Sequence, residues 1–271
     1  MKIYIMTDME GCAGMVNHDD WVMPDGRFYD LGRELLTKEI NAAVEGFFTA
    51  GATKIDVLDG HGAGGINPVL LDSRVRYVRI LTGYPFMPDN DGYDAIAWVG
   101  QHAKAGTQKA HIAHTGWFNV LDMRINGISV GEFGTEVFIA AEYGITPIFA
   151  SGDLALTIEA QALVPGIETV AVKNGLTEKD GASCDCDAYR KHNLSAAHIH
   201  PERARTLIRE GAERALKRYA ANPASFAATK INPPYVKETD YRKNGDTPAY
   251  SARATHPDSV VSLMNTAEVK Q

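Results

Sequence analysis

The sequence has few cysteines, no excess of positive charge and no long hydrophobic run. Its 271 residues include only Cys12, Cys184 and Cys186, and this odd, scattered set favours a reducing, cytoplasmic setting over a disulfide framework. Lys and Arg number 27 against 34 Asp and Glu, so the net charge is −7. This balance argues against nucleic acid or an anionic membrane as the main partner. No apolar stretch approaches the roughly 20 residues needed to span a bilayer.

Internal repeats, low-complexity tracts and a signal-peptide pattern are missing as well. The only early charge is Lys2, and the strand-like segment after it leads straight into polar residues, so we expect no signal peptide. The composition, 45% hydrophobic and 23% charged, is that of an ordinary globular protein. The length allows one large domain or two smaller ones.

Helix and strand patterns alternate over the first part of the chain. The apolar periodicity predicts helices at 28–50, 132–143 and 153–163. Strand patterns lie at 2–6, 54–58, 75–81, 95–99, 146–150 and 168–172. This alternation predicts an α/β fold with a mostly parallel sheet flanked by helices. In addition, Asn126-Gly127 between two apolar runs predicts a β-hairpin of strands 120–125 and 128–130.

The pattern changes after Lys173. Residues 174–200 are polar and irregular, whereas 201–219 have a regular helical stripe. The last 50 residues contain several prolines and little periodicity. We therefore expect an α/β domain over residues 1–173 and a smaller C-terminal α+β portion over 174–271.

Acidic and histidine side chains follow three of the predicted strands. Asp8 and Glu10 come after the first strand and would point to the same side if the extended conformation continued through Glu10. His61 follows the second strand, and His102 follows the strand at 95–99. In open parallel sheets, ligands bind outside the carboxyl ends of the strands. We expect these four side chains to share one site.

Glu132, at the start of a predicted helix, adds a third carboxylate. A glutamate there could simply complement the helix dipole, so its role depends on the other residues. Two carboxylates in one site repel each other unless a cation lies between them. Three carboxylates with two imidazoles favour zinc, with manganese or cobalt as possible substitutes. Five ligands exceed what one catalytic zinc ion takes from a protein, so the set predicts two ions per chain.

His111 and His114 are candidates for proton transfer, since a neutral histidine suits that role near pH 7. The spacing alone does not choose between them.

The sequence resembles the D-aminopeptidase family of dinuclear zinc metallopeptidases from residue 1 to about Lys173. Five motifs occur in the family's order and spacing: Asp8-Met9-Glu10-Gly11, Asp59-Gly60-His61, Gly100-Gln101-His102-Ala103, Ala113-His114-Thr115 and Val130-Gly131-Glu132-Phe133-Gly134.

The resemblance implies a role for each predicted ligand. Asp8 would bridge two zinc ions; Glu10 and Glu132 would complete one site, and His61 and His102 the other. Family members remove N-terminal D-amino acids from short peptides or amides and assemble as large ring-like homo-oligomers that enclose the active sites. Residues 1–173 would then be the catalytic domain, and 174–271 would shape substrate access and oligomer contacts.

His114 matches the position that the family assigns as the catalytic nucleophile or acid/base, which leaves open whether it or a water at the metal ions attacks the amide. Asp59 is interpreted as support for a ligand. The chain departs from the family pattern at Thr135-Glu136-Val137, where Glu136 puts an extra carboxylate near the site. Cys184 and Cys186, without a matching second pair, are more typical of a surface loop than of a metal site.

Three functions are compatible with these features. The first is a zinc-dependent hydrolase that cleaves an amide bond next to a free amino group in short peptides or amides. The second is a metal-dependent amidase or lactamase acting on a non-peptide or cyclic amide, which Glu136 motivates. The third is a non-catalytic, metal-binding oligomeric scaffold.

Overall fold

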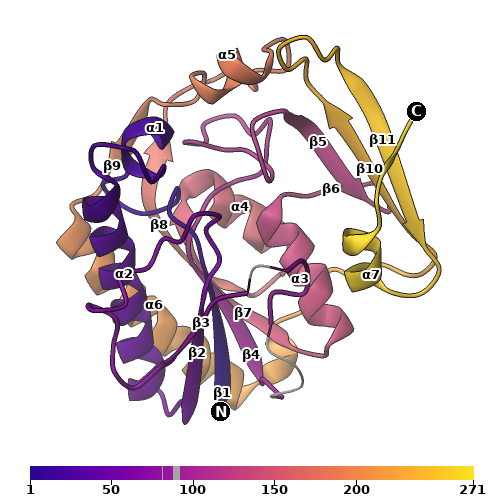
Figure 1. Cartoon of the computed structure of the whole chain (residues 1–271). Helices are drawn as coiled ribbons and strands as arrows, with labels where there is room; N and C mark the ends of the chain where they lie inside the picture. Colours follow the sequence, from indigo (N-terminus) through magenta and orange to yellow (C-terminus); the bar gives the residue numbers. More distant parts are fainter. Residues whose placement is uncertain (81, 88–91) are drawn as a thin grey trace.

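A computed structural model describes residues 1–80, 82–87 and 92–271 (Figure 1). The larger of its two sheets has the strand order β3-β2-β1-β4-β7-β8-β9. Neighbouring strands run parallel except at the β9 edge, where β9 pairs antiparallel with β8. The strands are β1 (Lys2–Thr7), β2 (Lys54–Asp59), β3 (Arg76–Val78), β4 (Ala95–Gln101), β7 (Thr146–Asp153), β8 (Glu168–Gly175) and β9 (Ala196–His198). The predicted fold class is confirmed.

Helices cover both faces of this sheet (Figure 1). Helices α2 (Tyr29–Thr49) and α6 (Pro201–Ala221) pack on one face, and α3 (Glu132–Glu142) and α4 (Leu154–Leu163) pack on the other. Successive residues of β1 alternate between the two cores: Ile3 lies under α2 and α6, and Tyr4 lies under α3 and α4. Burial on both faces explains why the central strands are continuously apolar.

The second sheet is antiparallel and has the order β12-β11-β10-β5-β6. Its strands are β5 (Val120–Ile125), β6 (Ile128–Ser129), β10 (Tyr235–Tyr241), β11 (Tyr250–His256) and β12 (Val269–Lys270). The predicted hairpin is present, with positive φ angles of 49° at Asn126 and 79° at Gly127. Because β5 pairs with β10, this sheet combines residues from both sides of position 173.

Several short elements were not predicted from the sequence. They are α1 (His18–Trp21), α5 (Cys186–Arg190), the 3-10 helix η1 (Pro223–Ser225) and α7 (Val260–Asn265). The strand predicted at 75–81 is shorter, since β3 ends at Val78, and Leu81 lies outside the described residues. Within the described ranges, no helix combines the length and apolar character that a membrane span requires.

The carboxyl ends of β1, β2 and β4 lie side by side, because β1 pairs with both neighbours. Thr7 is in register with Asp59 of β2 and with Val99 of β4. Three of the four segments that carry predicted metal ligands therefore leave the sheet at one edge. This shared edge is where parallel sheets bind their ligands.

The chain turns directly after β1, so the extended conformation does not continue through Glu10. The amide of Asp8 still donates to the carbonyl of Val99 at 3.1 Å, but the amide of Gly11 then donates to the carbonyl of Gly100 at 2.7 Å. Gly100 has a φ of +77°, and a Cβ there would lie 2.1 Å from the carbonyl oxygen of Asp8. Only glycine permits this approach, which fixes the Asp8–Glu10 turn against β4.

Candidate metal centre

A cavity of about 390 Å³ lies at this edge of the sheet. It is within the size range of small-molecule sites. Four of the five predicted metal ligands line it together with His114: Asp8, Glu10, His61 and Glu132. The fifth ligand, His102, is next to Asp8, with its Nε2 3.2 Å from Asp8 Oδ2. The structure therefore brings all five together.

The first ligand group comes from β1 and β2. One ligand atom from each of Asp8, Glu10 and His61 lies within 4.8 Å of the others. The Nε2 of His61 is 3.8 Å from Oε1 of Glu10. This proximity follows from the pairing of β1 with β2, since the last residues of the two strands, Thr7 and Asp59, are in register.

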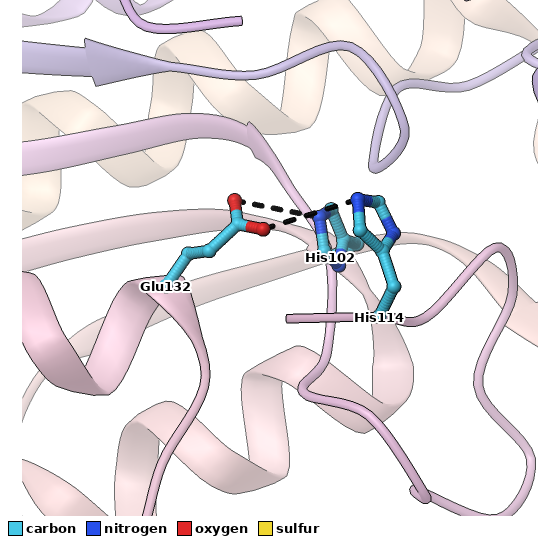
Figure 2. A group of neighbouring side chains, drawn as sticks. All are labelled: His102, His114 and Glu132. Carbon is cyan, nitrogen blue, oxygen red and sulfur yellow. Dashed lines mark ion pairs between the residues drawn. The ribbon is translucent and has the colours of Figure 1, made fainter. Parts of the chain in front are cut away.

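The second group contains His102, His114 and Glu132, whose ligand atoms also lie within 4.8 Å of one another. Figure 2 shows the carboxylate of Glu132 facing both rings, with Oε2 3.6 Å from His102 Nε2 and Oε1 3.9 Å from His114 Nε2. The two imidazoles stack with ring centroids 4.2 Å apart. Asp8 connects this group to the first through its contact with His102.

This grouping differs from the pairing that the resemblance implies. The resemblance joins Glu10 with Glu132 and His61 with His102, whereas the structure places Glu10 beside His61 and Glu132 beside His102. The reason is the strand order: β1 lies between β2 and β4, so His61 and His102 approach the site from opposite sides. Asp8 remains common to both sides.

Hydrogen bonds orient two of the imidazoles. The Nδ1 of His102 lies 2.9 Å from the carbonyl oxygen of Ala103, and the Nδ1 of His114 lies 2.9 Å from that of Ile112. A ring nitrogen beside a carbonyl oxygen carries the hydrogen, so Nε2 keeps its lone pair. In both residues Nε2 is the atom that faces the carboxylates, which is the arrangement of a metal-binding or proton-accepting histidine.

The unpaired atoms of the site fit a cation. Three buried atoms of the predicted ligands make no hydrogen bond with any residue that the structure describes: Glu10 Oε2, His61 Nδ1 and His102 Nε2. Buried polar atoms are rarely left without a partner. Carboxylate oxygens and imidazole nitrogens are the ligands that zinc takes, so the residues present suit two zinc ions.

The pKa values of the cluster are shifted because its ionisable groups are buried close to one another. Burial and the nearby Glu10 raise the pKa of Asp8 well above its usual range. Burial also acts to raise the pKa of Glu132, but His102 outweighs it and lowers that pKa to about 2. Burial and His102 lower the pKa of His114 to about 4. Burial and the neighbouring imidazole thus favour the neutral form of His114.

The two candidate histidines occupy different environments. His114 lines the cavity, while His111 is fully buried away from it. The amide of His111 donates to Asp153 Oδ2, its Nε2 lies 3.2 Å from the carbonyl oxygen of Val16, and its ring packs edge-on against His198. His111 thus connects segments of the fold, and of these two histidines it is His114 that lines the cavity.

Several residues support the ligands. Asp59 accepts hydrogen bonds from the amide of Gly65 and the hydroxyl of Tyr77. Arg79 donates to the carbonyls of Asp59 and His61. Together they hold the loop that carries His61, in line with the supporting role expected for Asp59.

Three residues near the site were missed in the sequence. Gln101 donates to Asp8 Oδ2 at 3.1 Å, and the buried Lys173 donates to the carbonyl of Glu10. His18 lines the cavity, with its ring centroid 6.3 Å from that of His114. Lys173 could have been noticed as a charge directly after the apolar run Val170-Ala171-Val172. Nothing in the local sequence distinguishes Gln101 or His18.

Cys184 and Cys186 belong to neither ligand group among the described residues. Cys186 is buried and packs with Ile112, Phe118 and Tyr189, with Cys184 at the edge of this cluster. The interpretation of the pair as a surface loop is therefore wrong for Cys186. We expect the double variant Cys184→Ser, Cys186→Ser to keep its zinc content and turnover and to lose about 1–2 kcal/mol of stability. Metal analysis and thermal unfolding measure both; a loss of zinc would contradict this assignment.

The parallel sheet and the carboxylate–histidine cluster at its edge define an α/β protein with a site suited to two divalent ions. A sequence model described as D-aminopeptidase matches residues 1–255. The chain belongs to the D-aminopeptidase family.

Two comparisons agree with this membership. The D-aminopeptidase of Bacillus subtilis (strain 168) is 30% identical over 182 residues, which cover 65% of each protein. The match thus spans just under two thirds of that relative's length. The structure of the zinc-dependent D-aminopeptidase DppA from Bacillus subtilis, described as a self-compartmentalizing protease, superposes with a TM-score of 0.80. At 21% identity it covers 97% of this chain and 94% of the other, so the two share a fold.

Proposed function

We propose that this protein is a zinc-dependent aminopeptidase that removes an N-terminal D-amino acid from short peptides or amides. The observation that carries the proposal is the pair of ligand groups joined by Asp8 at the cavity of a D-aminopeptidase family member. A cytoplasmic homo-oligomer is part of the proposal. It rests on the cysteine usage and on the self-compartmentalizing character of the DppA structure.

The geometry suggests how the ions are shared. Asp8, Glu10 and His61 would hold one zinc ion, and Asp8, His102 and Glu132 would hold the other. When bound, two zinc ions supply Lewis-acid polarisation of an amide carbonyl and a water whose pKa is lowered toward about 7.

The proposal gives His114 the role of proton transfer or direct attack. Its Nε2 lies 4.0 Å from Glu10 Oε1 and 3.9 Å from Glu132 Oε1, between the two ligand groups. Its ring stacks against His102 on one side, at 4.2 Å, and against Phe118, at 4.5 Å. These contacts fix the plane of the imidazole, and such positioning is what an acid/base or nucleophilic residue requires.

A substrate panel tests the proposed reaction. Zinc-loaded protein should hydrolyse D-alanyl-D-alanine and D-alanine amide, and it should act much more slowly on the L-isomers and on small lactams. Hydrolysis of the lactams alone would support the amidase or lactamase function that Glu136 motivates. Bound zinc without turnover of any amide would identify a non-catalytic scaffold. Size-exclusion chromatography with light scattering on the same sample measures the assembly, and a monomer would contradict the oligomer.

A further inference from the structure

One carboxylate in the cavity is used by neither ligand group. Glu136 lies one turn beyond Glu132 on α3, is 3% exposed and lines the cavity. Among the described residues, it is absent from both sets of candidate metal ligands. Its Oε1 accepts no hydrogen bond from any part of the chain that the structure describes. Such an atom in a cavity wall indicates a partner that arrives with the ligand.

The side chains described around Glu136 do not supply that partner. Tyr4 and Tyr84 lie near enough for burial and the Glu136 carboxyl to raise their pKa values well above the usual range. Neither hydroxyl donates to Glu136 Oε1. The hydroxyl of Tyr4 donates to the carbonyl of Phe86 instead. No Lys or Arg is found among the described residues that line the cavity. Burial, with Glu132 nearby, raises the pKa of Glu136 to about 8, which reflects the cost of a carboxylate there without a cation.

We propose that Glu136 binds the free ammonium group of the substrate's N-terminal residue. This inference rests on the proposed aminopeptidase function. Side chains at i and i+4 of a helix have Cβ atoms about 5–6 Å apart, so Glu136 lies one turn from Glu132. The α-ammonium group is two bonds from the scissile carbonyl carbon. A substrate whose carbonyl is beside Glu132 can therefore place its ammonium group next to Glu136.

The chemistry of the cavity favours this ligand group. An ammonium group beside Glu136 would favour the ionised carboxylate and so lower its raised pKa, and it would form a charge-assisted hydrogen bond with that carboxylate. An analogue without the amino group would leave the buried carboxylate unpaired, and sites of this kind reject such analogues strongly. Glu136 would thus make a free amino terminus a requirement for hydrolysis and would exclude N-acylated peptides.

The test compares two anilides that differ only in the amino group, D-alanine p-nitroanilide and propionic acid p-nitroanilide. In Glu136→Gln, kcat/KM for the amine substrate should fall by roughly 10²-fold, mainly through KM, and the slow hydrolysis of the propionyl substrate should stay the same. Zinc content should be unchanged. The matched control is Glu159→Gln on α4. Glu159 also has one buried carboxylate oxygen without a hydrogen bond among the described residues, but the residue does not line this cavity. The Glu159→Gln variant should keep the wild-type preference for the amine substrate over the propionyl substrate.

A preference for the amine that survives in Glu136→Gln would overturn the inference. If this variant does not fold, Glu136→Asn removes the same charge and is judged by the same ratio. Calorimetry on the zinc-loaded wild type decides independently. D-Alaninol, which has the amino group but no amide bond to hydrolyse, should bind more tightly than 1-propanol, and equal binding would mean that the cavity does not recognise the ammonium group. The proposed function fails separately, if the zinc-loaded wild type hydrolyses neither the anilides nor the peptides of the substrate panel.

Discussion

Asp8→Ala is expected to lose both zinc ions and, with them, all measurable turnover. Asp8 has contacts on both sides: it groups with Glu10 and His61, and its Oδ2 lies 3.2 Å from His102 Nε2. Without it, each ion would keep two protein ligands, and a catalytic zinc ion normally has three. The measurement is the metal content per chain after dialysis, compared with the two ions that we expect in the wild type.

The control for this variant is Asp30→Ala, which removes an exposed carboxylate from α2. It should keep two ions and full turnover. Circular dichroism should show the same fold in both variants, because Asp8 lies in a turn outside the strands. Retention of both ions in folded Asp8→Ala would contradict the bridging role.

His114→Ala is expected to lower kcat by roughly 10²-fold or more while the zinc content stays at the wild-type level. A loss of this size is usual for an acid/base residue, and His114 lines the cavity between the ligand groups. His111→Ala should change kcat only slightly. It should lower the melting temperature instead, because the buried His111 ring packs against His198 and lies beside the carbonyl of Val16.

Both variants need metal analysis beside the kinetics, since His114 is also within ligand distance of His102 and Glu132. If His114→Ala loses one ion, His114 is a zinc ligand rather than the proton-transfer residue. If His111→Ala is inactive with full zinc content while His114→Ala is active, the catalytic assignment is wrong.

Local patterns predicted most of the large sheet, and the candidate ligands that they indicated lie close together in the structure. Asp8, Glu10, His61 and His102 follow strands whose apolar runs are easily recognised, and the carboxyl ends of parallel strands meet at one edge. The extended conformation that would align Asp8 with Glu10 ends at Thr7, because the chain turns there. The turn depends on the approach of Gly100 from another strand, which no local pattern contains.

Features that depend on contacts between distant segments were not predictable. The pairing of Glu10 with His61 follows from the position of β1 between β2 and β4, and the sequence does not specify strand order. The weak alternation of β10 hid a strand that is stabilised by pairing with β5 and β11. The unpaired oxygen of Glu136 is likewise defined by residues far away in the chain.

The most direct test of the two-ion centre is a crystal structure of the zinc-loaded protein with anomalous data collected at the zinc edge. We expect two peaks per chain in the cavity, both in contact with Asp8. One should also contact Glu10 and His61, and the other His102 and Glu132. A single peak, or two peaks that share no contact with Asp8, would contradict the account.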